Sequence, residues 1–465
     1  MGVIRTRPIR NRPEPPVFFG RGGLGKELAI MIASTGRSML VGAVVLALAA
    51  APPVAFARPA GHAAGKHPVE KKQAEKPATQ PERVDFTAAE SATAWPEGLP
   101  GRLRLDGDDP RAFQALIDGA GAAGDPWLVL SGGGENGAFA AGLLAGWSQA
   151  GDRPAFGVVT GVSTGALIAP FAFVGPAADP ALRANYTEIT AADVFELGGN
   201  PTAALTDNWP LKDRIDKSVT PDLLKAVAAE HAKGRRLLIA TTQVDAERST
   251  VWDMGAIAGL AAGKDAGRYG DKALKLFREI VLASTAIPGV FPPVMIDALG
   301  EDGKRFQEMH NDGGAMAPFY LAPAPALVGR TSGVHLPTHS VYLVVNNRLT
   351  PEFGIAPRTI LGVLGHSMSA AIKAQTRGAI ALAQIFAQRS GLDLHVAEID
   401  GRFTKASSAP FDPDYMKALY QHGEGLGRAG TAFTASQVKG DGPLESVKGT
   451  ATQPTDGLGD SAAAR

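Results

Sequence analysis

Short apolar runs alternate with longer segments of helical periodicity along the middle of the chain. Four runs consist almost entirely of apolar side chains and predict buried strands, at 127–130, 156–159, 236–240 and 341–345. Apolar residues recur at helical spacing over four other segments, 138–150, 165–174, 271–283 and 357–391. Buried strands that alternate with helices are typical of α/β proteins. The pattern therefore predicts a mainly parallel central sheet flanked by helices.

The two ends of the chain lack this pattern. Residues 58–95 are rich in Pro, Ala, Lys and Glu, whereas 436–465 are rich in Gly, Ser, Thr and Asp. Such compositions cannot bury enough apolar surface to fold, so we expect a linker and a disordered tail. One globular domain without internal repeats is expected between them, over 96–435.

The N-terminal region has the layout of an export signal. An apolar run over 39–51 follows an arginine and precedes Ala55-Phe56-Ala57, an A-x-A cleavage pattern. The run is shorter than the roughly 20 residues of a membrane span. We expect 1–57 to comprise an N-terminal extension and a cleaved signal peptide, which makes the protein periplasmic or secreted; an uncleaved anchor is the alternative. Met31 is an alternative start to Met1, because the residues before it are rich in Arg and Pro.

Charge and cysteine content exclude several classes of function. Lys plus Arg and Asp plus Glu both number 46, so no basic surface for nucleic acid is expected. The chain has no cysteine, which excludes disulfides, thiolate metal sites, a cysteine nucleophile and a lipid-modified cysteine. No set of His, Asp and Glu has a spacing typical of metal ligands, so we expect neither metal nor cofactor.

A glycine-rich loop, Ser131-Gly132-Gly133-Gly134-Glu135-Asn136-Gly137, directly follows the first predicted strand and precedes a helix. Backbone N–H groups in such a loop can approach an anion closely, and the helix dipole adds positive potential. The anion could be a dinucleotide pyrophosphate or the oxyanion of an acyl-transfer intermediate. The acidic residue of a dinucleotide site, expected about 20 positions further on, is absent. A purely structural turn is the remaining alternative.

A second motif, Gly161-Val162-Ser163-Thr164-Gly165, lies between a predicted strand and a helix. This G-x-S-x-G pattern in a strand–turn–helix context is typical of a nucleophile elbow, in which a sharp turn exposes the serine hydroxyl. An ordinary helix cap by Ser163 is the simpler interpretation. The glycine loop one βα unit upstream favours Ser163 as a nucleophile.

A third motif, Asn311-Asp312-Gly313-Gly314, follows further along the chain, shortly after the segment 283–293 (Ala-Ser-Thr-Ala-Ile-Pro-Gly-Val-Phe-Pro-Pro). Together with the glycine loop and the G-x-S-x-G, these elements resemble the patatin-like phospholipase family over 127–316. The resemblance implies a three-layer α/β sandwich that hydrolyses acyl esters of lipids. It also implies a Ser–Asp dyad without histidine, in which Ser163 forms an acyl-serine and Asp312 is the base.

The resemblance assigns roles to several glycines. The backbone amides of Gly132, Gly133 and Gly134, chiefly the last two, would form the oxyanion hole. The motifs would be supported by Gly137, Gly161, Gly165, Gly313 and Gly314. Relatives usually carry Arg or Lys just before the last glycine of the loop, where this chain has Asn136. A cation there would favour a phosphate head group, so the resemblance predicts ester hydrolysis more firmly than phospholipid specificity.

The expected partner is a lipid or ester substrate, with transient contact to a membrane surface, although no basic amphipathic stretch marks an interfacial helix. An aspartate with the ordinary pKa of about 3.9 is a weak base at neutral pH. Burial raises this pKa, and a direct hydrogen bond would align the carboxylate with the serine hydroxyl.

Two other functions remain open. A Ser-Asp-His triad esterase of the α/β-hydrolase type also uses G-x-S-x-G, and His310 and His366 are its main histidine candidates. A catalytically inactive domain that binds lipid or a partner is the other alternative. The simultaneous presence of the glycine loop, Ser163 and Asp312 argues against an inactive domain.

Overall fold

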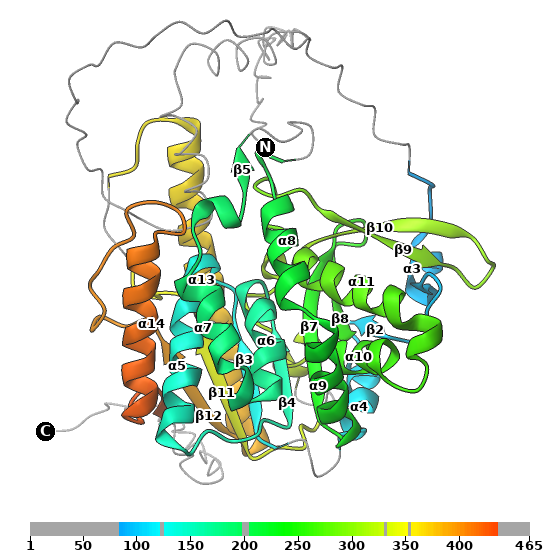
Figure 1. Cartoon of the computed structure of the whole chain (residues 1–465), viewed down its shortest axis with the longest axis horizontal. Coiled ribbons are helices and arrows are strands. Elements are labelled where there is room, and N and C mark those ends of the chain that lie inside the picture. Colours follow the sequence, from blue (N-terminus) through cyan, green and yellow to red (C-terminus); the bar gives the residue numbers. More distant parts are fainter. Residues whose placement is uncertain (1–82, 121–124, 198–203, 330–332, 352–354, 436–465) are drawn as a thin grey trace, which may run out of the picture.

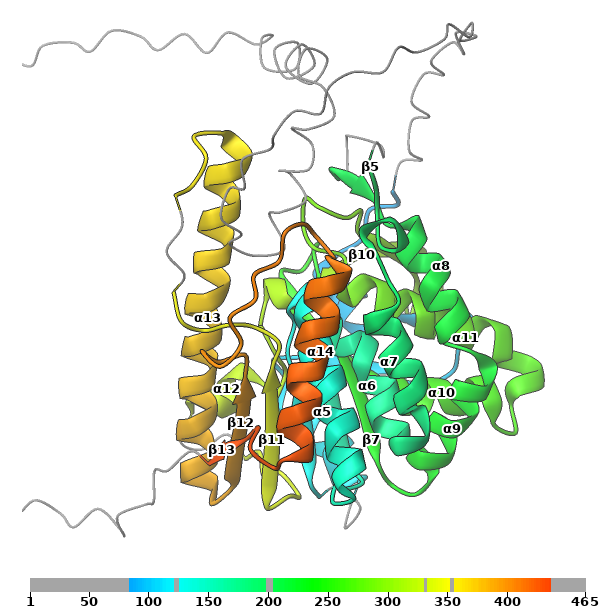
Figure 2. The same cartoon turned by 60° about the vertical axis from the view of Figure 1, so that its left-hand side comes forward.

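The computed structural model describes residues 83–120, 125–197, 204–329, 333–351 and 355–435. An eleven-stranded mixed sheet lies between two layers of helices (Figures 1 and 2). The expected signal peptide, residues 58–82 of the expected linker and the C-terminal tail lie outside the described residues. The remaining linker residues, 83–95, are structured, because they include a short helix over Ala88–Thr93 and the start of a strand at Trp95.

The five central strands are parallel, as the sequence predicts. They follow one another across the sheet in the order β7 (Arg236–Gln243), β4 (Val158–Gly161), β3 (Trp127–Leu130), β11 (Ser340–Val345) and β12 (Asp393–Glu398). Their side chains alternate between two cores: Leu128 and Leu130 of β3 pack on one face, and Trp127 and Val129 on the other. Both faces of β3, β4, β7 and β11 are covered, which explains why these four strands have the predicted apolar runs. β12 was not predicted, because its sequence, DLHVAE, mixes polar and apolar residues.

Antiparallel strands extend the sheet on both sides. Beyond β7 lie β10 (Arg305–Asp312), β9 (Val294–Leu299) and β1 (Trp95–Pro96). β8 (Arg248–Asp253) also pairs with β7, and β2 (Arg104–Asp106) pairs with β8. β13 (Thr434–Ala435) pairs with β12 at the other edge. A separate two-stranded sheet consists of β5 (Glu196–Leu197) and β6 (Thr206–Asp207).

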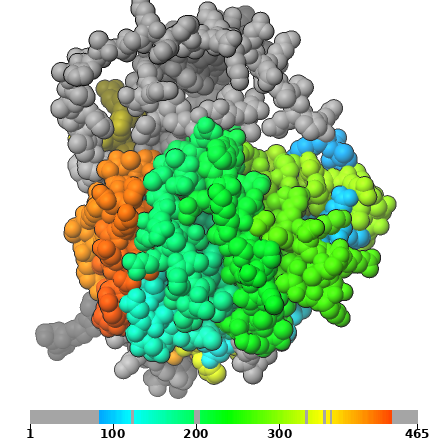
Figure 3. All heavy atoms as spheres, viewed as in Figure 1, coloured from blue at the N-terminus to red at the C-terminus, as the bar shows by residue number. Residues whose placement is uncertain are grey.

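Most helices cover one face of the sheet (Figure 1), and their residues form most of the surface seen from the same side in Figure 3. They are α5 (Gly137–Ala150), α6 (Thr164–Val174), α7 (Asp179–Thr187), α8 (Trp209–Ser218), α9 (Pro221–Ala232), α10 (Met254–Ala262), α11 (Ala266–Ser284) and α14 (Pro413–Arg428). The other face is covered by α4 (Pro110–Asp118), α12 (Ala324–Val328) and α13 (Ile360–Ser390). A short helix, α3 (Ala88–Thr93), precedes β1, and single 3₁₀ turns occur at Gly134–Asn136, Pro176–Ala178, Ala191–Asp193 and Gly313–Ala315. The four predicted helical segments correspond to α5, α6, α11 and α13.

The carboxyl ends of the parallel strands lie together at one end of the molecule. The glycine loop follows β3 and Ser163 follows β4, so both candidate motifs are at this end. The N-terminal half of α13 projects from the same end in both views (Figures 1 and 2). Within the described ranges, every helix is too short or too polar to cross a membrane.

Candidate active site

Ser163 occupies a strained turn between β4 and α6. Its φ of 55° and ψ of −124° are unusual for a residue with a side chain. Glycines on both sides allow the turn to close: a Cβ on Gly161 would lie 2.5 Å from the Gly165 carbonyl oxygen. The Ser163 amide donates to Ser284 Oγ at 3.0 Å, and that hydroxyl donates to the Ala240 carbonyl at 2.8 Å. These contacts build the sharp turn of a nucleophile elbow.

The hydroxyl of Ser163 hydrogen-bonds to Asp312 and not to the helix it precedes. It makes no capping hydrogen bond to α6, so the interpretation of Ser163 as a helix cap is wrong. Instead, Ser163 Oγ donates to Asp312 Oδ2 at 2.6 Å. The two residues are 149 positions apart in the sequence, and the fold brings their side chains into direct contact.

Asp312 is held at the end of β10 by contacts to its backbone and side chain. Its Oδ1 accepts from the Gly314 amide at 2.7 Å, which leaves Oδ2 for Ser163. The Asp312 amide donates to the Ala286 carbonyl at 2.9 Å, so the segment 283–293 directly supports the aspartate. A Cβ on Gly313 would lie 2.5 Å from the Ala240 carbonyl oxygen, so that position requires glycine.

Burial makes Asp312 a stronger base than an exposed aspartate. Only 5% of its surface is exposed, and burial raises its pKa to about 6, against the opposing effect of the hydrogen bonds from Ser163 and Gly314. A carboxyl group with this pKa is still mostly ionised at neutral pH. It can therefore accept the hydroxyl proton of Ser163 there.

The glycine loop lies directly against the nucleophile. A Cβ on Gly132 would be 3.1 Å from the Cβ of Ser163, and one on Gly133 would be 1.9 Å from the Asn346 carbonyl oxygen. The amides of Gly133 and Gly134 have no acceptor within the described part of the chain, so they are candidate donors to an oxyanion. The Gly132 amide donates to the Pro318 carbonyl at 2.9 Å. The prediction that this amide belongs to the oxyanion hole is therefore wrong, because its hydrogen is already donated to Pro318.

Asn346, at the end of β11, fixes the loop and was not singled out from the sequence. Its amide donates to Ser131 Oγ at 2.8 Å, and its Nδ2 donates to the Ser131 carbonyl at 2.9 Å. Its Oδ1 accepts from the Ala140 amide of α5 at 3.2 Å. The only sequence signal is a polar residue at the carboxyl end of an apolar strand, where functional groups gather.

Neither side chain before Gly137 supplies a cation to the site. Asn136 Oδ1 accepts from the Tyr415 hydroxyl at 2.7 Å. Glu135 is buried, and burial raises its pKa to about 7 against hydrogen bonds from Ser407 and from the backbone of Phe411 and Asp412. Gly137 itself allows α5 to approach the elbow, since a Cβ there would lie 2.2 Å from Thr164 Oγ1.

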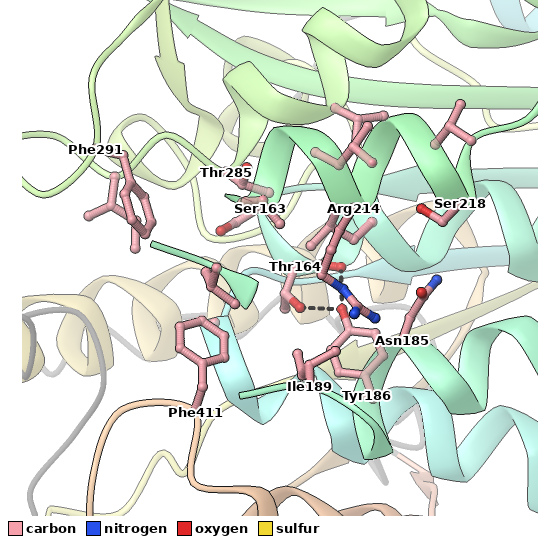
Figure 4. Close-up of a pocket in the computed structure, with 18 of the residues that line it drawn as sticks. Ser163, Thr164, Asn185, Tyr186, Ile189, Arg214, Ser218, Thr285, Phe291 and Phe411 are labelled. Carbon is pink, nitrogen blue, oxygen red and sulfur yellow. Dashed lines mark hydrogen bonds between the residues drawn. The ribbon is translucent and has the colours of Figure 1, made fainter. Parts of the chain in front are cut away.

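Ser163 and Gly134 line a pocket of about 960 Å³, its open mouth included (Figure 4). Most of the wall is apolar and comes from α6, α8, α11 and the segments around them. The apolar lining residues are Leu167, Pro170, Phe171, Ile189, Val194, Leu211, Ile215, Val219, Val281, Ile287, Val290, Phe291 and Phe411. The pocket therefore suits a hydrocarbon chain that extends from a group at Ser163.

The histidine candidates lie elsewhere. His310 is fully buried, with Nδ1 3.0 Å from Thr241 Oγ1 and Nε2 3.6 Å from Glu308 Oε2. His366 is part of α13 on the opposite face of the sheet from α6. Over the described ranges no histidine hydrogen-bonds to Ser163 or Asp312, which favours the dyad over a triad. These ranges also contain no group of three or more His, Cys, Asp or Glu that could hold a metal ion.

Residues 128–325 match the family model described as Patatin-like phospholipase. No curated protein sequence matches the chain. The solved structure of VipD from Legionella pneumophila is similar over 66% of this chain and 67% of its own, with 11% identity and a TM-score of 0.33, too distant a likeness to bear on function. Over residues 128–325 the chain is therefore similar to patatin-like phospholipases.

Proposed function

We propose that this domain is a lipid acyl hydrolase that cleaves carboxylic esters through an acyl-serine intermediate. The observation that carries the proposal is the 2.6 Å hydrogen bond between Ser163 Oγ and Asp312 Oδ2 at the wall of an apolar pocket. The match of residues 128–325 to the patatin-like phospholipase model supports the same reaction class.

In the proposed first step, Ser163 Oγ attacks the ester carbonyl carbon while its proton passes to Asp312 Oδ2. The carbonyl oxygen becomes an oxyanion that accepts hydrogen bonds from the Gly133 and Gly134 amides, at the positive end of α5. The tetrahedral intermediate then collapses, the bond to the alcohol oxygen breaks, and protonated Asp312 gives its proton to the leaving alcoholate. Serine is left esterified to the acyl group.

In the second step, water takes the place of the alcohol. Asp312 accepts a proton from the water as its oxygen attacks the acyl carbonyl, and the same two amides bind the second oxyanion. Collapse of this intermediate releases the carboxylic acid and returns the proton to Ser163 Oγ. Both steps need only one base, which suits a site where Asp312 is the one titratable side chain, among the described residues, that is hydrogen-bonded to the nucleophile.

A lipid substrate also implies contact with a membrane surface, which we propose is made by the projecting half of α13. No Asp, Glu, Lys or Arg occurs over 359–372. Val363, Leu364 and Met368 are 55%, 47% and 37% exposed. Exposed apolar side chains near a lipid site are typical of membrane contact. Export through the N-terminal signal would place the enzyme in the periplasm or outside the cell, which N-terminal sequencing of the mature protein tests.

Turnover of short- and long-chain esters by the wild type and by Ser163→Ala and Asp312→Asn tests the function. We expect both variants to lose at least about a thousandfold in kcat, because each removes a member of the unit that forms the nucleophile. Ser390→Ala, at the end of α13, and Asp297→Asn, an exposed carboxylate on β9, are matched controls that should keep wild-type turnover. Full activity in Ser163→Ala would refute the proposal.

A further inference from the structure

The pocket that holds Ser163 contains one charged side chain among its described lining residues. This residue is Arg214 of α8, and the other polar residues that line the pocket are neutral. In the close-up, Arg214, Asn185 and Ser218 lie on one side of the pocket, with Phe291 and Phe411 on the other and Ser163 between (Figure 4). The pocket therefore has an apolar side and a side where a cation and two neutral polar groups gather.

Arg214 is held much more loosely than other arginines of the same helical layer. Its closest carboxylate is Asp193, at 3.8 Å and itself 40% exposed, and it makes no hydrogen bond within the described ranges. Arg278 of α11, in contrast, donates to the carbonyls of Val219 and Asp216 at 3.0 and 2.6 Å. Arg153 likewise has Asp179 at 2.7 Å and the Ala172 carbonyl at 3.0 Å. The donors of Arg214 are thus available to a ligand.

The surroundings of Arg214 favour an anion. Its side chain is only 27% exposed and faces a largely apolar cavity, where the attraction between opposite charges is stronger than in water. The planar guanidinium binds carboxylate or phosphate through two parallel hydrogen bonds. The nearby amide of Asn185 and hydroxyl of Ser218 are further donors. An exposed partner such as Asp193 is displaced at small cost.

We propose that Arg214, assisted by Asn185 and Ser218, forms a subsite for an anionic oxygen group on the ester substrate. The inference rests on the proposed hydrolase function and adds a preference for esters that carry a negative charge. Glu135 and Asn136 of the glycine loop provide no cation, and Arg214 is the one cation among the described residues that line the pocket. The charge can come from the phosphate of a phospholipid head group or from a carboxylate at the far end of the acyl chain.

Binding to the Ser163→Ala variant tests the subsite without any turnover. Dodecyl phosphate, dodecanoate and dodecanol serve as probes in a competition assay with a fluorescent fatty alcohol. With Arg214 present, we expect an anionic probe to bind more tightly than dodecanol. Arg214→Gln should weaken the anionic probe roughly ten- to a hundredfold, the range of a charge-assisted hydrogen bond, and leave dodecanol within twofold. Lys212→Gln removes an exposed charge from the same helix and should change neither.

Kinetics then separate the two sources of charge. One pair of substrates is a lysophospholipid and the monoacylglycerol with the same chain; the other is a methyl ester with and without a terminal carboxylate. A loss of kcat/KM in Arg214→Gln confined to the phosphate-bearing substrate assigns the subsite to the head group, and a loss confined to the carboxylate-bearing one assigns it to the acyl end. Equal losses for charged and neutral probes, or none, would overturn the subsite. Absence of all ester turnover in the wild type, with anion binding intact, would instead overturn only the hydrolase function.

Discussion

Two residues at the site adopt states that folding alone would not favour. Ser163 has a positive φ, which costs roughly 1–3 kcal/mol for a residue with a side chain. Asp312 is an acid buried without a cation beside it, so its ionised form is destabilised. Both features serve the proposed reaction, because the first exposes a nucleophile and the second strengthens its base.

The raised pKa of Asp312 predicts how activity depends on pH. The proposed base must be ionised, so kcat/KM for a water-soluble short-chain ester should rise with pH and reach half its plateau near pH 6. Measurement between pH 4.5 and 8.5 tests this. A midpoint near 4, the value of an exposed aspartate, would mean that Asp312 is not the group that titrates.

The same pKa predicts a gain in stability for Asp312→Asn. The folded-state pKa of about 6 is above the unfolded value of 3.8, so wild-type stability is lost as pH rises from about 4 through 6. The amide side chain at this position in the Asp312→Asn variant carries no charge, so the variant does not lose stability as pH rises. Above pH 7 we expect the free energy of unfolding of the variant to exceed that of the wild type by up to about 3 kcal/mol. Urea unfolding should show this difference in full at pH 8 and only about a third of it at pH 4.5, where the folded carboxyl group is still protonated. A variant less stable than wild type at pH 8 would contradict the prediction.

Sequence alone could predict the parts of the site that are local. Ser163 and the glycine loop each follow a strand and carry their own short pattern, so each was identified from neighbouring residues. Asp312 depended on resemblance, because an Asp-Gly-Gly by itself is equally typical of a turn. Asn346 and Pro318 act through contacts with residues more than a hundred positions away, and no local pattern marks them.

At the level of elements, α5 and α14 pack unusually closely. A Cβ on Gly142 of α5 would lie 2.0 Å from the Tyr420 carbonyl oxygen, and one on Gly423 of α14 would lie 2.3 Å from that of Phe139. Gly146 and Gly427 repeat the arrangement one turn further on. Because α5 begins directly after the glycine loop and α14 carries Tyr415, which donates to Asn136 of that loop, this contact holds the loop in place.

Gly142→Ala should destabilise the protein by about 1–3 kcal/mol, because the added methyl overlaps a backbone atom that cannot move alone. Gly425→Ala is the matched control: it lies on α14 with no atom within 4 Å of its Cβ position. There alanine should stabilise the helix by up to about 1 kcal/mol. Chemical denaturation of both variants tests the pair, and similar effects in both would argue against close packing as the cause.

The strands illustrate why prediction of elements succeeded only in part. β3, β4, β7 and β11 are covered on both faces, so their apolar runs are visible in the sequence. β10 was not predicted because only one of its four buried side chains, that of Phe306, is apolar. The other three, Glu308, His310 and Asp312, are polar. The carboxylate of Glu308 accepts hydrogen bonds from Ser91 and Arg104, which are distant in the sequence and are brought close only by the fold.

At the scale of the whole molecule, the proposed active site and the projecting half of α13 share one end. α13 touches the segment after Asp312, where Gln375 Nε2 donates to the Met316 carbonyl at 3.2 Å, and Met316 is 38% exposed. A membrane bound to α13 would therefore face the end of the sheet at which the ester must enter.

Leu364→Asp should weaken binding to zwitterionic phospholipid vesicles and turnover of lipid within them by roughly tenfold or more, because a charge is placed where an apolar side chain would enter the bilayer interface. Ile385→Asp is the matched control, since Ile385 is 55% exposed on the other half of the same helix. Vesicle co-sedimentation measures both. Equal losses, or none, would remove α13 from the proposed contact.

The central claim is that Ser163 becomes esterified while Asp312 takes its proton. Incubation with a fluorophosphonate, followed by mass spectrometry of the peptides, tests it most directly. We expect one adduct, on Ser163, which is absent from Ser163→Ala and forms far more slowly in Asp312→Asn than in Asp297→Asn. An adduct on another residue, or no adduct in a folded protein that still cleaves esters, would contradict the account.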